Sequence, residues 1–243
     1  MKFVIPSYNR YDKLNSLSLK YLKSQNINAS DIYIFVRVDD DDLVNYHKLK
    51  DDGYNIITTV GCKGIGKTHN YITEYFEENE FIIELDDDLI DIVDKDKKPI
   101  ESLDNELNKM IEIMKKDNIN YGGFYQVDNK LFMSRRDNYE TDLRYLLGIF
   151  RIRRICKDII LETNFSEDFE NCLLHYIRDG KILKNNWLCA KTKNYAKGGC
   201  NADGRDTETE RKDKTFLSEK YPKYTRLFQR KSGIWDLRIK HYV

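Results

Sequence analysis

Three consecutive carboxylates, Asp86, Asp87 and Asp88, directly follow a mostly apolar run at residues 81–85. A short apolar run predicts a buried strand, and side chains alternate along an extended chain, so Asp86 and Asp88 are expected to point the same way. Two neighbouring carboxylates repel each other unless a hard cation such as Mg²⁺ or Mn²⁺ lies between them. The pattern favours a metal site for a phosphate-bearing ligand. A solvated acidic turn is the alternative that these three residues alone leave open.

A glycine-rich loop precedes this strand. Residues 61–68, GCKGIGKT, match the P-loop pattern G-x-x-x-x-G-K-[ST] between an expected strand and an expected helix. In a P-loop, backbone N–H groups and Lys67 would bind phosphates, and Thr68 would bind Mg²⁺. Two strand–helix units precede the loop, however, and nothing downstream completes an NTPase site. A P-loop NTPase or kinase therefore remains a rival interpretation.

The elements that would position these residues alternate between strands and helices. We expect strands at residues 2–5, 31–38, 55–60 and 81–85, and helices at 11–25, 43–52 and 68–78. This alternation predicts an α/β fold with a mostly parallel central sheet and helices on both faces. Ligands bind such sheets at the carboxyl ends of the strands. Polar loops follow all four strands there, with Ser7 to Arg10, Asp39 and Asp40, the glycine loop, and the three aspartates.

The second half is less regular. We expect a helix at 101–117, strands near 121–125, 150–155 and 182–189, and a helix ending at Gly180. Gly122, Gly123 and Tyr125 lie in an aromatic, glycine-rich stretch, which we assign to a substrate pocket that binds the acceptor.

The C-terminal residues 211–243 carry ten lysines and arginines against three acids, although the whole chain has 41 of each sign. Aromatic residues are interleaved with these charges. Basic and aromatic residues together suit a phosphate-backbone partner, with Arg226 and Arg230 as candidate contacts. A solvated helix whose aromatic residues pack on the domain is the alternative.

Composition sets broad limits. The 243 residues are 40% hydrophobic and 34% charged, enough for one large or two small soluble domains. Five cysteines without a CxxC pair argue against a disulfide framework and a structural zinc site, and favour a cytoplasmic location. No apolar run approaches about 18 residues, so we expect neither a signal peptide nor a membrane span.

Five motifs in order resemble those of GT-A fold nucleotide-sugar glycosyltransferases. Residues 5–10, IPSYNR, resemble the opening hhP(S/T)YNR of that family. In that family an acidic residue at the end of the second strand contacts the base, and Asp39 or Asp40 would take this position here. Residues 64–70 resemble its G-x-x-x-x-R-N loop, with His69 where arginine is common. The three aspartates match its DxD motif, and Glu167-Asp168 resembles its ED motif. The ordered match spans residues 3–185.

The resemblance implies roles for these residues. Asp86 and Asp88 would hold Mn²⁺ or Mg²⁺ on the diphosphate of the donor, and Asp168 or Glu167 would deprotonate an acceptor hydroxyl, inverting the anomeric centre. Without the resemblance, an acidic pair at a helix start is explained by the helix dipole alone. Donor-binding residues would be Pro6, Ser7, Tyr8, Arg10, Asp39, Asp40, Gly64, Gly66, Lys67, Asn70, Asp86 and Asp87.

Several motifs resemble more narrowly the TET/JBP-associated glycosyltransferases of phages and large viruses, which implies hydroxymethylated pyrimidines in DNA as acceptor. The implied organisation is a transferase domain at 1–190, divided into a nucleotide-sugar-binding half (1–98) and an acceptor-binding half (99–190), with a basic extension at 191–243. Glycan or protein acceptors, and a nucleic-acid-binding module with a degenerate transferase fold, remain open alternatives.

Overall fold

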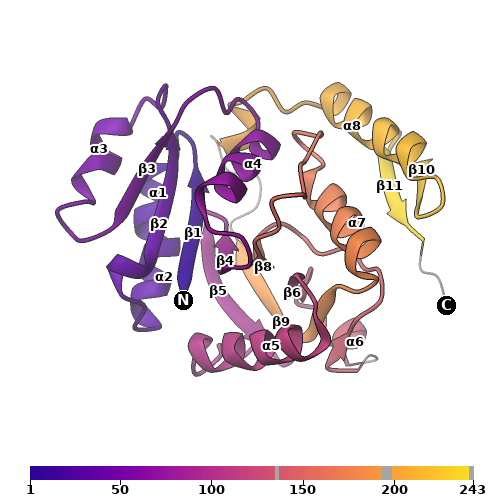
Figure 1. Cartoon of the computed structure of the whole chain (residues 1–243), viewed down its shortest axis with the longest axis horizontal. Coiled ribbons are helices and arrows are strands. Elements are labelled where there is room, and N and C mark those ends of the chain that lie inside the picture. Colours follow the sequence, from indigo (N-terminus) through magenta and orange to yellow (C-terminus); the bar gives the residue numbers. More distant parts are fainter. Residues whose placement is uncertain (135–136, 193–198, 241–243) are drawn as a thin grey trace.

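The computed structural model describes residues 1–134, 137–192 and 199–240. Within them, one large sheet has the strand order β3-β2-β1-β4-β8-β6-β9-β5, with β7 also paired to β9 (Figure 1). Pairing directions make β1, β2, β3, β4, β6 and β9 run one way and β5, β7 and β8 the other. The sheet is therefore mostly parallel, as expected. The strands are β1 (Lys2–Ser7), β2 (Ile32–Arg37), β3 (Asn55–Thr59), β4 (Phe81–Leu85), β5 (Leu89–Asp94), β6 (Tyr121–Tyr125), β7 (Tyr139–Glu140), β8 (Phe150–Arg154) and β9 (Leu183–Thr192).

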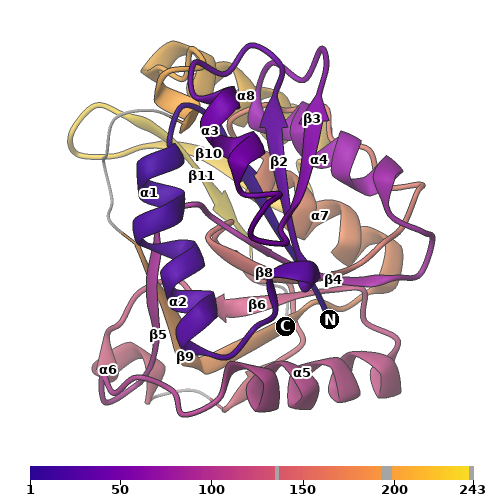
Figure 2. The ribbon, with the colours of Figure 1, turned by 90° about the vertical axis from the view of Figure 1, so that its left-hand side faces the viewer.

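Helices cover both faces of the sheet, because successive strand residues point to opposite sides. Phe3 and Ile5 of β1 pack with α1 (Tyr11–Ser16), α2 (Ser18–Ser24), α3 (Leu43–Lys48) and α5 (Leu103–Asp117). Val4, between them, packs instead with α4 (Ile65–Tyr75). Figure 2 shows α1 and α2 on the near side of the strands, with α7 (Glu167–Asp179) beyond them. The short elements η1 (Ala29–Asp31), α6 (Lys130–Met133) and η2 (Gly199–Asn201) lie in connections.

Some boundaries differ from expectation. The helix expected at 11–25 is two helices, because Leu17 leaves the helical region. At the break, the buried Ser18 hydroxyl donates to the Asp86 carbonyl (2.8 Å) and accepts from the Leu89 amide (2.9 Å), so it anchors the acidic turn. Helix α4 begins at Ile65, three residues early, and β5 was not predicted. Helix α7 does end at Gly180, whose φ of 73° suits glycine.

The C-terminal segment is a helix followed by a hairpin. Helix α8 (Thr207–Lys220) precedes the antiparallel strands β10 (Thr225–Gln229) and β11 (Trp235–Ile239). Leu217, Leu237 and Ile239 share a core cluster with α7 residues Cys172 and Leu173, and Figure 1 shows α8 and the hairpin outside α7. The aromatic residues thus pack partly on the domain, but the purely helical alternative is wrong. Within the described part of the chain, no helix is long and apolar enough to cross a membrane.

Candidate active site

A cavity of about 1010 Å³ lies at the carboxyl ends of the parallel strands. Ser7 from β1, Arg37 from β2, Thr59 from β3 and Asp86 after β4 all line it. The opposite wall comes from the start of α7 and from the β10–β11 hairpin. The prediction that polar loops converge at this edge is therefore confirmed for Pro6, Ser7, Tyr8, Arg10, Gly64 and the three aspartates, which all line the cavity.

The three aspartates occupy the turn between β4 and β5 and have different partners. Asp87 accepts hydrogen bonds from the Ser7 hydroxyl (2.7 Å) and from Arg10 Nη1 (3.0 Å). Asp88 lies 3.6 Å from the same Arg10 nitrogen. Asp87 is thus held by the protein itself, whereas Asp86 and Asp88 face the cavity with fewer partners.

The electrostatics of this turn suit a divalent cation. Burial and the neighbouring carboxylates of Asp88 and Asp87 raise the pKa of Asp86 to about 7, and burial also raises the pKa of Asp88. A cation between Asp86 and Asp88 would offset both effects. No cluster of three or more His, Cys, Asp or Glu that could hold a metal occurs in the described ranges. Two carboxylates with ligand phosphates are nevertheless a common way to bind Mg²⁺, so the residues fit such an ion.

The acids after β2 do not reach the cavity, contrary to the expectation for Asp39 and Asp40. The Asp39 carboxylate is exposed and paired with Arg37. Asp40 is buried and accepts hydrogen bonds from the amides of Asn9 (2.7 Å) and Asp42 (2.8 Å), so it shapes the loop. Both side chains are therefore engaged in local structure.

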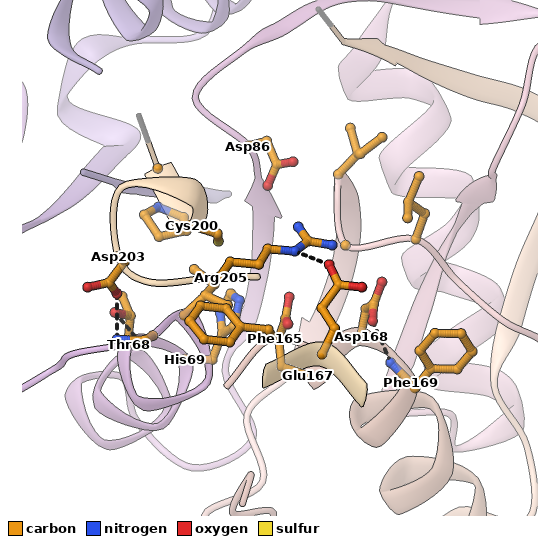
Figure 3. Close-up of a pocket in the computed structure, with 18 of the residues that line it drawn as sticks. Thr68, His69, Asp86, Phe165, Glu167, Asp168, Phe169, Cys200, Asp203 and Arg205 are labelled. Carbon is orange, nitrogen blue, oxygen red and sulfur yellow. Dashed lines mark hydrogen bonds and ion pairs between the residues drawn. The ribbon is translucent and has the colours of Figure 1, made fainter. Parts of the chain in front are cut away.

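Asp203, from the C-terminal segment, does line the cavity near β2 and the Gly64 loop. The Asp203 carboxylate accepts a hydrogen bond from the Gly64 amide (2.6 Å) and pairs with Arg37 (Figure 3). Arg37 in turn lies over the Tyr8 ring, 4.1 Å from its centroid. The Gly199 amide donates to the Tyr8 carbonyl (2.9 Å). Residues 199–206 thus bind the loops at which the sequence predicted donor recognition. Nothing in the sequence pattern indicated this contact.

The glycine loop serves packing. A Cβ on Gly66 would lie 1.9 Å from the Thr163 carbonyl oxygen, and one on Gly64 would lie 2.4 Å from the Asn164 side chain. The Gly64 amide donates to Asp203, and the Gly66 amide donates to the Asn164 carbonyl. In a P-loop, these two amides would instead be free to bind phosphates.

Two further predicted donor contacts, Lys67 and Asn70, do not line the cavity. Lys67 is exposed. Asn70 donates to the Leu161 carbonyl and accepts from its amide (2.8 and 2.9 Å). Asn70 therefore fastens α4 to the segment before α7, and these contacts support neither a P-loop nor the donor roles that were expected of Gly66, Lys67 and Asn70.

Glu167 and Asp168 begin α7 and line the cavity. Asp168 accepts hydrogen bonds from the Tyr145 hydroxyl and from the Phe169 amide (2.8 Å), and the Tyr145 ring stacks on Phe169. Burial and the Asp168 charge raise the pKa of Glu167 to about 8, and burial also raises the pKa of Asp168. Hydrogen bonds to a carboxylate favour its ionised form, so Asp168 is the ionised member of the pair.

The expected acceptor residues on β6 lie elsewhere. Gly122 and Gly123 are buried where a Cβ would meet the carbonyl oxygens of Leu183 (3.1 Å) and Phe150 (3.0 Å). Tyr125 lies under Lys184, 4.4 Å from the ring centroid. These residues pack neighbouring strands and do not line the large cavity. Of the two basic candidates, Arg230 lines the cavity and Arg226 does not.

A buried ionic cluster beside the site was not predicted. It comprises Glu84, His69, Arg151 and Arg153, each at most 3% exposed. Its signals were present: Glu84 interrupts an apolar strand, and arginines alternate with apolar residues in β8. In a strand inside a sheet, both faces are buried, so this alternation does not mark a solvent-facing side.

No protein-family model and no curated protein matches this sequence. Solved structures do match. TarS residues 1–349 from S. aureus, in complex with UDP, has a TM-score of 0.53 and 16% identity, over 90% of this chain and 66% of that chain. Glucosyl-3-phosphoglycerate synthase from Mycobacterium tuberculosis, with Mn²⁺, UDP and glucosyl-3-phosphoglycerate, has a TM-score of 0.53 and 10% identity, over 99% and 86%. The chain thus spans just under two thirds of TarS 1–349. These matches confirm the GT-A fold.

Proposed function

We propose that this protein is a metal-dependent glycosyltransferase whose nucleotide-sugar donor is a UDP-sugar. One observation carries the proposal: two acidic pairs, Asp86 with Asp88 and Glu167 with Asp168, line one cavity at the carboxyl edge of a GT-A sheet. Figure 3 shows Asp86 on one side of this space and Glu167 and Asp168 on the other. The UDP and Mn²⁺ bound by proteins of this fold support the same donor and ion.

Asp86 and Asp88 would hold Mn²⁺ or Mg²⁺, which supplies Lewis-acid stabilisation of the leaving diphosphate. Arg10 keeps the intervening Asp87 in place (3.0 Å). This bond fixes the turn, so that the outer two carboxylates present their oxygens to one site. Tyr8, Arg37 and Gly64 form the far end of the cavity, where the base and ribose of a donor would lie.

Asp168 is the proposed general base, as the family resemblance implied. Its hydrogen bonds from Tyr145 and the Phe169 amide orient it and keep it ionised. Glu167 holds a proton at neutral pH, since burial and Asp168 raise its pKa to about 8. A base on the wall opposite the metal carboxylates suits attack from the face away from the diphosphate, which inverts the anomeric centre.

The β10–β11 hairpin favours an anionic acceptor. We propose that this acceptor is DNA carrying hydroxymethylated pyrimidines, and that the protein acts in the cytoplasm. Arg226 and Arg238 are direct cross-strand partners and both exposed. Like charges placed opposite each other destabilise a hairpin. Neither arginine has an acidic partner among the described residues. Phe228, Arg230 and Arg238 continue this face into the cavity. A phosphate backbone would relieve the repulsion and lead a base towards the acid pair.

A thermal-shift screen of nucleotide sugars with and without Mn²⁺ tests the donor. UDP-sugars should raise the melting temperature only with the metal, and Asp88→Asn or Asp86→Asn should abolish that dependence. Asp51→Asn, at an exposed site, is the matched control. Failure of every nucleotide sugar to bind the wild-type protein would refute the proposal.

Fluorescence anisotropy with single-stranded DNA at several salt concentrations tests the acceptor. Arg226→Ala and Arg238→Ala should each weaken binding and lower the salt slope by about one. Lys116→Ala removes an exposed charge on α5 and should change neither. Sugar transfer to hydroxymethylated but not to unmodified DNA would identify the acceptor. Transfer only to glycans or proteins would exclude it.

A further inference from the structure

The buried cluster between β4, β8 and α4 has an uneven charge. The Glu84 carboxylate bonds to His69 Nδ1 (3.0 Å), and lies 3.0 Å from Arg151 Nε and 2.7 Å from Arg153 Nε. Burial and Arg151 lower the pKa of His69 to about 4, so His69 is neutral at pH 7. One carboxylate thus faces two guanidinium groups, a net charge of +1. An uncompensated buried charge is strongly unfavourable, so an anion nearby is required.

Arg151 directs that excess charge towards the acid pair. It lines the cavity, is 2% exposed, and its Nη1 has no hydrogen-bond partner among the described residues. A Cβ on Gly148 would lie 3.5 Å from Arg151 Nη1 and 3.6 Å from Glu167 Oε1. Both groups therefore border the same small space beside Gly148, although no direct ion pair joins them among the described residues.

We propose that Arg151 is a positioning residue that keeps one carboxylate of the Glu167–Asp168 pair ionised, so that the pair holds a single proton at neutral pH. This inference rests on the proposed function insofar as the pair supplies the general base. The ionised carboxylate completes the charge balance of the cluster: Glu84 and Asp168 then match Arg151 and Arg153, with His69 and Glu167 neutral.

Other groups also act on the pair and must be held constant. Tyr145 bonds to Asp168 from the preceding loop, and Cys200 and Arg205 approach Glu167 from the C-terminal segment. Arg205 is itself paired with Glu210 (2.5 Å). Among these groups Arg151 alone belongs to the buried cluster, which solvent does not screen.

Arg151→Met is the decisive variant, because it removes the charge and keeps much of the side-chain volume. The acidic limb of the pH profile of kcat/KM should move to higher pH by about one unit. Arg151→Lys, which keeps the charge, should restore it in part. Gly148→Ala is the control for packing: its added methyl group would have its nearest contacts at 3.5–3.7 Å, ordinary van der Waals distances, and it should move the limb by less than Arg151→Met does. An unchanged limb in Arg151→Met would overturn the inference.

A second measurement does not depend on activity. Carboxyl ¹³C NMR of aspartate- and glutamate-labelled protein follows both carboxylates, assigned with Asp168→Asn and Glu167→Gln. The first ionisation of the pair should occur at higher pH in Arg151→Met than in wild type, and identical titrations would refute the role of Arg151. UDP binding should be the same in both proteins. Loss of the proposed function would appear instead as absent UDP binding in wild type, whatever the titrations show.

Discussion

The carboxyl groups in this cavity differ in protonation and in role, and the difference comes from their hydrogen-bond and charge partners. Asp87 forms an ion pair with Arg10 and accepts a hydrogen bond from Ser7, whereas Asp86 lies beside two other carboxylates and its pKa is raised to about 7. Asp168 accepts two hydrogen bonds that Glu167 does not share. Hydrogen bonds to the charged form stabilise it. At one pH, one of two adjacent carboxyl groups can therefore be ionised while the other is protonated.

Tyr145→Phe tests this at the single-residue scale. The Tyr145 hydroxyl donates to Asp168 and favours its ionised form, lowering the Asp168 pKa relative to burial alone. Removing the hydroxyl should raise the apparent pKa of the acidic limb of kcat by about one unit and lower the rate on that limb by up to about tenfold.

Tyr176→Phe is the matched control for this change. Tyr176 lies on helix α7, as Asp168 does, and packs against Tyr224 of the C-terminal segment. It should leave the pH profile unchanged. If both variants behave alike, the Tyr145 hydroxyl has no part in ionising Asp168.

At the scale of elements, helix α4 positions the acid pair by close packing. Gly66 lies against the Thr163 carbonyl, and Asn70 bonds to both backbone groups of Leu161. These contacts fix the chain just before α7, where Glu167 and Asp168 begin. The glycines that resemble a phosphate-binding loop therefore help to position the wall of the cavity that carries Glu167 and Asp168.

Gly66→Ala should destabilise the protein, because its Cβ would lie 1.9 Å from the Thr163 oxygen. We expect a loss of about 1–3 kcal/mol in the free energy of unfolding, measured by urea denaturation. Lys67→Ala, at the neighbouring exposed position, should change neither stability nor UDP binding. Equal stability of Gly66→Ala and wild type would contradict the close approach.

The segment 199–206 is held in place by groups at the proposed donor end of the cavity. Asp203 accepts a hydrogen bond from the Gly64 amide and pairs with Arg37, which lies over the Tyr8 ring. Asp203→Asn should therefore tighten UDP binding, by about three- to tenfold in calorimetry, because a competing negative charge is removed. Glu208→Gln on exposed α8 is the control. Weaker binding in Asp203→Asn would mean that Asp203 organises the donor site instead of competing for it.

At the scale of the whole molecule, α7 joins the sheet to the C-terminal segment. Its buried face includes His175, whose ring stacks on Tyr121 of β6 at 4.8 Å. Neither ring nitrogen of His175 has a hydrogen-bond partner among the described residues. Burial lowers its pKa to about 3. The native state thus keeps this imidazole neutral, while the unfolded chain protonates it below about pH 6.5.

His175→Phe should consequently stabilise the protein, and increasingly so at lower pH. A depressed native pKa contributes stability above pH 6.5 that is lost as pH falls towards 3. The stability difference between variant and wild type should grow by about 1.4 kcal/mol per pH unit below 6.5. Urea denaturation at pH 8, 6 and 5 measures it. A constant difference across these values would show that the pKa of His175 is the same in the native and unfolded states.

Sequence alone determined the mostly parallel sheet, the edge at which its polar loops meet, and the acids Asp86 to Asp88 at that edge. Those features follow from local apolar runs and from the chain direction of parallel strands, which bring Ser7 and Asp86 together. The acidic pair singled out by motif order begins α7 and lines the same cavity, and its catalytic role stays a prediction.

Tertiary structure alone decided which side chains remain available to a ligand. Asp40 and Asn70 satisfy backbone groups, and Asp203 reaches the donor end from 139 positions beyond Gly64. Arg151, Glu84 and His69 meet only because β8 inserts antiparallel beside β4. Local patterns encode burial and periodicity. The partners of a buried polar group depend instead on long-range strand order, which no short stretch of sequence contains.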